Sequence, residues 1–93
     1  MKLDIKYIEN FWEYMRETFE TENLEFAIDE FDIDVQKIEN LNELSEEEAY
    51  TLMHDMVYMV LNEFFSGDFD TMFETLTDTI GMPEDLVEEL LDF

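Results

Sequence analysis

The stretch from residue 49 to residue 65 is apolar around most of the circumference of an α-helix. Its large apolar side chains are Leu52, Met53, Met56, Val57, Met59, Val60, Leu61, Phe64 and Phe65. The remaining polar stripe is narrow and consists of Thr51, His54, Asp55, Tyr58 and Asn62. A helix that is hydrophobic nearly all round must be covered by other elements. The sequence therefore predicts a central helix over residues 46–65, with the rest of the chain packed against it.

Local signals mark both ends of this predicted helix. Ser45 followed by Glu48 is a capping box, and Glu46 and Glu47 stand at the positive end of the helix dipole. Gly67 fits the left-handed position that commonly ends a helix. Residues 40–44 are expected to be a connection.

The first 38 residues predict one long helix and two short ones. Residues 5–20 divide into an apolar and a polar half, with Asp4 as a suitable cap. Residues 21–38 are interpreted as two helices that meet near residues 32–34, with Thr21 or Asn23 as a cap and Phe26 and Ile33 off the apolar face. The alternation of residues 31–35 also fits a short strand, but one isolated strand has nothing to pair with.

The C-terminal third predicts two further helices. Residues 69–80 carry apolar side chains on one side, and this helix is expected to stop at Gly81. Pro83 is expected at the first position of the last helix, with Leu86, Val87, Leu90 and Leu91 facing inward. The predicted fold is all-α: a compact single-domain bundle of five or six helices over residues 1–93.

The charge of the chain is strongly unbalanced. Asp and Glu number 27 against four Lys and Arg, which gives a formal net charge of −23, and no Lys or Arg follows Lys37. High net charge is typical of disorder, but disordered chains lack the 46% hydrophobic and 15% aromatic content found here. The chain is therefore expected to fold in spite of its self-repulsion.

Composition also limits location and partners. The chain has no Cys, its first residues lack the pattern of a secretory signal, and no apolar run is long enough to cross a bilayer. These features favour a cytoplasmic protein. Anionic membranes and bare nucleic acid would repel it, so direct binding to either is not expected.

No enzyme, metal or cofactor site is expected. His54 stands beside Asp55, but a general base also needs a nucleophile or oxyanion donors, and no such motif is present, so His54 is interpreted as structural. One His cannot supply a di-metal carboxylate site. Residues 32–34 and 68–70 begin like calcium loops but lack the glycine and the bidentate Glu that such loops require.

Carboxylates form three clusters, which are the candidate partner-binding residues. They are Glu9, Glu13, Glu17 and Glu20; Glu46, Glu47 and Glu48; and Glu84, Asp85, Glu88 and Glu89. Like charges at this helical spacing cost a few tenths of a kcal/mol per pair, and the surfaces of small domains usually mix both signs. Four helical residues advance about 6 Å, so one stripe imitates a single strand of phosphates. A duplex, with one charge per about 1.7 Å of axis, would take several stripes or a homodimer.

In size, charge and predicted compactness the chain resembles the small acidic nucleic-acid mimics, many encoded by phages, that include anti-CRISPR and anti-restriction proteins. These proteins share no common fold. The resemblance implies an inhibitor that acts in the host cytoplasm and fills the DNA- or RNA-binding channel of a defence protein. A CRISPR effector is the first choice, followed by a restriction enzyme or a DNA-packaging protein.

Two other functions fit the same sequence. One is an immunity protein or antitoxin that neutralises a basic nuclease toxin. The other is an acidic adaptor that binds through exposed Phe and Met, although Met at helical spacing is more typical of a core.

Overall fold

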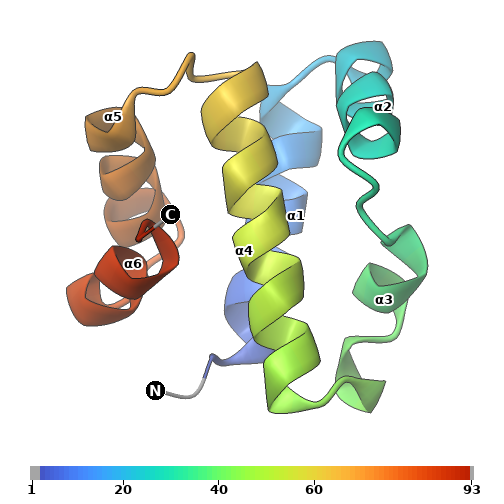
Figure 1. Ribbon diagram of the computed structural model, residues 1–93, viewed down its shortest axis with the longest axis vertical. Helices are drawn as coiled ribbons and strands as arrows, with labels where there is room; N and C mark the ends of the chain where they lie inside the picture. Colours follow the sequence, from blue (N-terminus) through green and yellow to red (C-terminus); the bar gives the residue numbers. More distant parts are fainter. Residues whose placement is uncertain (1–2, 93) are drawn as a thin grey trace.

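The computed structural model describes residues 3–92, and helix α4 (Glu46–Glu63) runs through its middle (Figure 1). This helix contacts α1, α2, α5 and α6. Its buried residues are Ala49, Leu52, Met53, Met56, Val57, Met59, Val60 and Leu61. The predicted central helix is confirmed, and it ends two residues earlier than expected.

The predicted capping box and left-handed end of α4 are both present. Ser45 Oγ accepts a hydrogen bond from the Glu48 N–H, and Glu48 Oε1 accepts one from the Ser45 N–H, each at 3.1 Å. After α4, Ser66 and Gly67 both have positive φ, 51° and 79°. The Gly67 N–H donates to the carbonyl of Leu61 at 2.8 Å, which satisfies a last-turn oxygen of the helix.

Helix α1 (Ile5–Thr18) packs on α4 through Ile8, Phe11 and Met15. Asp4 caps it as expected, since its side chain accepts from the Lys6 N–H at 3.0 Å. The prediction that this helix continues to residue 20 is wrong. Phe19 leaves the helix with extended dihedral angles, and its ring stacks on Phe64 with 3.9 Å between centroids. Burial of this aromatic pair ends α1 earlier than its local pattern indicates.

The next segment forms two short helices, α2 (Thr21–Glu30) and α3 (Val35–Glu39), followed by the 3₁₀ turn η1 (Leu41–Glu43). The predicted meeting point at residues 32–34 is confirmed, and no strand occurs between residues 3 and 92. The N-cap of α2 is Glu20, so neither Thr21 nor Asn23 takes that position. Phe26 lies off the apolar face and is 68% exposed, whereas Ile33 is buried because it belongs to the connection and not to a helix.

The helix predicted over residues 69–80 consists of α5 (Phe69–Glu74) and a wider π-helical continuation, η2 (Thr75–Thr79). The hydroxyl groups of Thr75 and Thr77 donate to backbone carbonyls one turn earlier, at 2.8 and 2.9 Å. Such bonds compete with the regular helical ladder. Pro83 is the N-cap of α6 (Glu84–Leu90), one position before the expected place.

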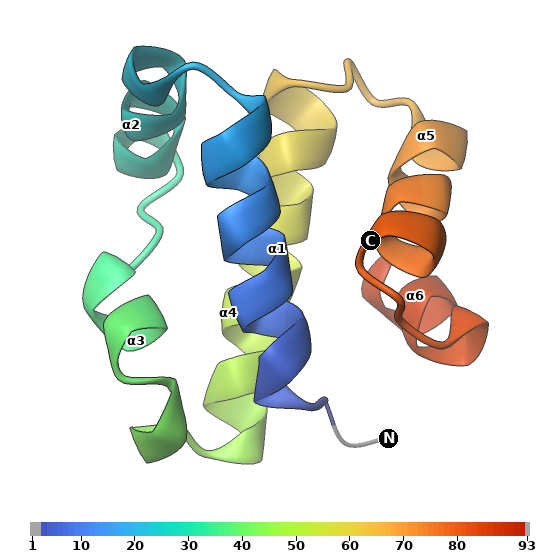
Figure 2. The ribbon, with the colours of Figure 1, turned by 180° about the vertical axis from the view of Figure 1, so that it is seen from behind.

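The helices are arranged around α4 in a compact all-α globule. Helices α2 and α3 lie on one side of α4, α5 and α6 lie on the other, and α1 crosses the face turned to the viewer in Figure 2. The radius of gyration is 12.2 Å, which matches the value of about 12 Å for a packed domain of this length. No helix in the described part of the chain has the length and apolar composition needed to cross a membrane.

Candidate partner-binding surface

Every carboxylate of the chain is on the surface. All 27 Asp and Glu residues are exposed, and the described residues bury no polar or charged side chain. Between residues 3 and 92, the one contact of a Lys or Arg nitrogen with a carboxylate within 4.0 Å joins Lys37 Nζ to Glu48 Oε2, at 4.0 Å. Most of the anionic field is therefore directed outward and is not neutralised by neighbouring cations.

The first predicted cluster is divided between two helices. Glu9, Glu13 and Glu17 follow one another on the exposed side of α1. Glu13 and Glu17 line a hollow toward α2 and a second, smaller one beside Thr79, so they form a ridge between two depressions. Placing Glu20 on the same helix was wrong. It caps α2, where its carboxylate accepts from the Asn23 amide at 3.5 Å.

The second and third predicted clusters lie on neighbouring helices. Glu46, Glu47 and Glu48 form the first turn of α4, and Glu84, Asp85, Glu88 and Glu89 lie on α6. The Tyr50 hydroxyl donates to the backbone carbonyl of Glu89 at 3.2 Å and connects the two helices. The structure therefore makes α4 and α6 neighbours, whereas the first cluster belongs to the α1 face of Figure 2.

Hydrogen bonds fix some carboxylates and favour their charged form. The backbone N–H and then the hydroxyl of Ser45 lower the pKa of Glu48, and Lys37 adds a smaller effect. The Thr71 hydroxyl, 2.7 Å away, and the Thr71 N–H lower the pKa of Asp68. Asp4 and Asp34 also accept backbone N–H bonds, at the starts of α1 and α3. These four carboxylates therefore have defined positions at helix starts.

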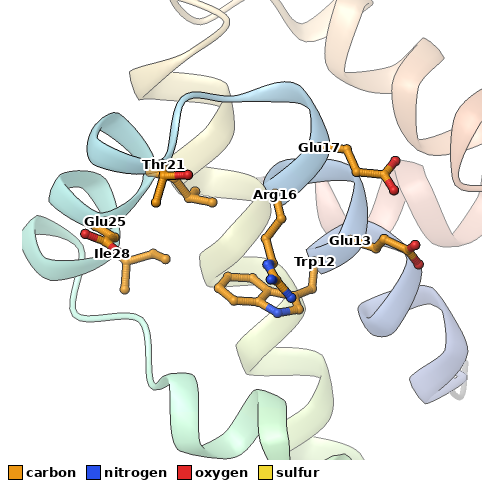
Figure 3. Close-up of a pocket in the computed structure, with 8 residues that line it drawn as sticks. Trp12, Glu13, Arg16, Glu17, Thr21, Glu25 and Ile28 are labelled. Carbon is orange, nitrogen blue, oxygen red and sulfur yellow. The ribbon is translucent and has the colours of Figure 1, made fainter.

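A hollow of about 500 Å³ lies between α1 and α2 (Figure 3). Trp12 and Arg16 project into it from α1, and Thr21, Glu25 and Ile28 face it from α2. Trp12 is half-buried, although its place in the sequence pattern assigned it to the apolar half of α1. The sequence carried one signal for this hollow. Arg16 follows Trp12 by one helical turn and lies on the same face, and a charged side chain there indicates that this face is partly open to solvent.

Comparison with protein-family models, curated proteins and solved structures gives no match to this chain.

The described residues include no set of three His, Cys, Asp or Glu side chains placed to hold a metal ion. His54 is half-exposed, with Nδ1 3.7 Å from Asp55 Oδ1 and its ring stacked on Tyr50. The described surface offers many exposed carboxylates and, in the hollow between α1 and α2, the half-buried ring of Trp12.

The methionines in the described part of the chain do not form a binding surface. The six between residues 3 and 92 are buried: Met15, Met53, Met56, Met59, Met72 and Met82. An adaptor of the kind considered above would have to rely on the exposed Phe26 and Phe69 instead.

Proposed function

We propose that this chain is a nucleic-acid-mimicking inhibitor, which binds the Lys- and Arg-lined groove of a nucleic-acid-binding protein and so keeps DNA or RNA out. The observation that carries the proposal is the outward placement of all 27 carboxylates on a packed helical body. Protein surfaces that serve only solubility usually mix both signs of charge. A surface this uniform is complementary to a strongly positive one.

The folded body supports mimicry because it limits the entropy lost on binding. Carboxylates mounted on helices are already in place, whereas a disordered acidic tail would have to be ordered. On α1, Glu9, Glu13 and Glu17 advance by about 6 Å per step, close to the axial spacing of every second phosphate on one strand, about 7 Å. The clusters on α4 and α6 extend the anionic surface around the molecule.

The target class follows from the charge. A protein that normally holds many phosphates offers the matching array of Lys and Arg, and a CRISPR effector is our first candidate, before restriction enzymes and DNA-packaging proteins. The inhibitor itself would not bind nucleic acid, since the two repel each other.

The test is binding to such a protein as a function of salt and of competing DNA. Isothermal titration calorimetry should give a dissociation constant that rises steeply with salt, because salt screens contacts between exposed charges. DNA should displace the chain from its target, because the cations that would bind the carboxylates also bind phosphates. A small cationic protein with no nucleic-acid groove is the control. Binding that is insensitive to both salt and DNA would exclude mimicry.

A further inference from the structure

A continuous groove separates α1 from the α2–α3 segment. It consists of the 500 Å³ hollow described above and an adjoining one of about 570 Å³ beside the 31–34 connection. The two hollows meet at Trp12, Glu25 and Ile28, and we call them together the α1–α2 groove. Helix α2 has 10 residues and is therefore about 15 Å long, which equals three turns of a bound helix or four to five extended residues.

The floor of the α1–α2 groove is apolar. Trp12 and Ile28 are half-buried on it, and Leu24 lies beneath them with 5% exposure. The floor stays partly open because α2 buries only Leu24 and Ala27 against the rest of the protein. A half-exposed Trp in a groove is the kind of side chain that contributes strongly to binding at protein interfaces.

The rim of the groove is anionic along α2 and the connection that follows it. The exposed carboxylates there are Glu25, Asp29, Asp32 and Asp34. Glu13 and Glu17 border the groove from α1, but their side chains point away from α2 in Figure 3. Among residues 3–92, the one cation that lines the groove is Arg16, which lies beside the Trp12 ring in Figure 3. An apolar floor beside a row of carboxylates is complementary to a segment with apolar side chains on one face and Lys or Arg on the flank next to it.

We propose that the α1–α2 groove is the docking site for a basic amphipathic segment of the partner protein. Its apolar side chains contact Trp12 and Ile28, and its Lys and Arg side chains reach the rim carboxylates. A second copy of this chain is a poor occupant because its carboxylates would face those of the rim. The proposal rests on the proposed function in taking the partner to be cationic, and it adds an apolar anchor that polynucleotide mimicry does not require.

Trp12 is the only tryptophan, so its fluorescence reports directly on the groove. Two synthetic peptides with equal numbers of Lys serve as probes: a helical peptide with Leu on one face, and the same peptide with every Leu replaced by Ser. The Leu peptide should shift Trp12 emission to the blue and bind about tenfold more tightly, because only it desolvates the floor. Equal binding by both peptides, or unchanged emission, would overturn the proposal.

Two matched triple variants separate the groove from the general field. Glu25→Gln/Asp29→Asn/Asp32→Asn removes three rim charges. The control Glu43→Gln/Glu63→Gln/Glu74→Gln removes three charges that do not line the groove; all six side chains are exposed. The rim variant should bind the Leu peptide about tenfold more weakly, since each exposed pair contributes at most about 1 kcal/mol. The control variant should change binding less than twofold. Equal weakening by both would show that net charge alone attracts the peptide.

This experiment and the DNA competition can fail separately. If the Leu peptide binds as expected but DNA never displaces the chain from a cationic target, the docking proposal stands and nucleic-acid mimicry is excluded. If DNA displaces the chain but the two peptides bind alike, mimicry remains and the groove proposal is wrong.

Discussion

The hydroxyl of Tyr50 in α4 donates a hydrogen bond to the backbone carbonyl of Glu89 in α6, at 3.2 Å. The two residues are 39 positions apart in the sequence, so this bond is a long-range connection between the two helices. Glu89 lies in the last turn of α6, where its carbonyl also accepts a hydrogen bond from the Asp92 N–H at 3.4 Å. The bond therefore adds a second donor to this carbonyl and joins the C-terminal end of α6 to α4.

Removing this hydroxyl should weaken the fold. Tyr50→Phe keeps the ring and loses the bond, so we expect the free energy of unfolding to fall by about 1 kcal/mol. Urea denaturation followed by circular dichroism measures this. Tyr14→Phe is the control, because the Tyr14 ring packs on Phe11 and Phe19 and the substitution preserves these contacts. A loss as large in the control would show that the hydroxyl bond is not the cause.

The same residue predicts a dependence on alkaline pH. Burial, followed by the charges of Glu89 and Asp92, raises the pKa of Tyr50. The folded state thus favours the neutral phenol, and the resulting stabilisation is present below the ordinary Tyr pKa of about 10 and is lost as pH rises through the higher folded value. The unfolding free energy of the wild type should fall more steeply in this range than that of Tyr50→Phe. Parallel curves from urea denaturation would contradict the prediction.

Glu48 predicts the opposite trend in acid. Its pKa is lowered, first by the Ser45 N–H, so its contribution is present above the ordinary Glu pKa and is lost as pH falls through the lower folded value. Glu48→Gln keeps an acceptor for the capping box but does not titrate. The unfolding of this variant should therefore depend less on acid pH than that of the wild type. Thermal melts from neutral to acidic pH measure this. Glu47→Gln, in the same turn, should keep the acid dependence of the wild type.

Salt should raise the melting temperature of this protein. The exposed carboxylates repel one another, and added NaCl screens them because they are in contact with solvent. Glu84→Gln/Glu88→Gln/Glu89→Gln should gain less from the same salt, since it has fewer charges to screen. Differential scanning calorimetry at several NaCl concentrations checks both statements, and a fall in melting temperature would contradict them.

Local motifs predicted most of the helical structure. The capping box of Ser45 and Glu48, the cap at Asp4 and the left-handed Gly67 all act over a few residues, and the structure confirms them. The end of α1 could not be found in this way. Residues 5–20 fit one helical pattern, and what ends the helix is the stacking of Phe19 on Phe64, which are 45 positions apart.

The α1–α2 groove was missed for a related reason. Trp12 fits the apolar half of α1, and a helical wheel does not show how much of that half the neighbouring helices cover. The cover is set by α2, which fully buries only Leu24 and Ala27 and leaves Trp12 half-exposed. Glu20 was likewise assigned to α1 because the local pattern continues through it, although the chain has already turned into α2.

The α1 cluster gives the cleanest test of the mimicry mechanism by charge reversal. Reversing Glu46, Glu47 and Glu48 would break the capping box, and reversing Glu84 and Asp85 would place cations at the positive end of α6. Glu9, Glu13 and Glu17 are exposed within α1, so Lys at these positions should leave the helical circular-dichroism signal unchanged.

Glu9→Lys/Glu13→Lys/Glu17→Lys should therefore lose the ability to block DNA binding by a cationic target. The three new Lys side chains on α1 would repel the target's Lys and Arg, which the wild-type carboxylates attract. Gln at the same three positions should have a smaller effect. Glu13→Lys alone should change inhibition little, since one exposed ion pair contributes about 0 to 1 kcal/mol. Inhibition is measured as the shift in a DNA-binding isotherm of the target. Full inhibition by the folded triple-Lys variant would show that Glu9, Glu13 and Glu17 do not contact the target's cations.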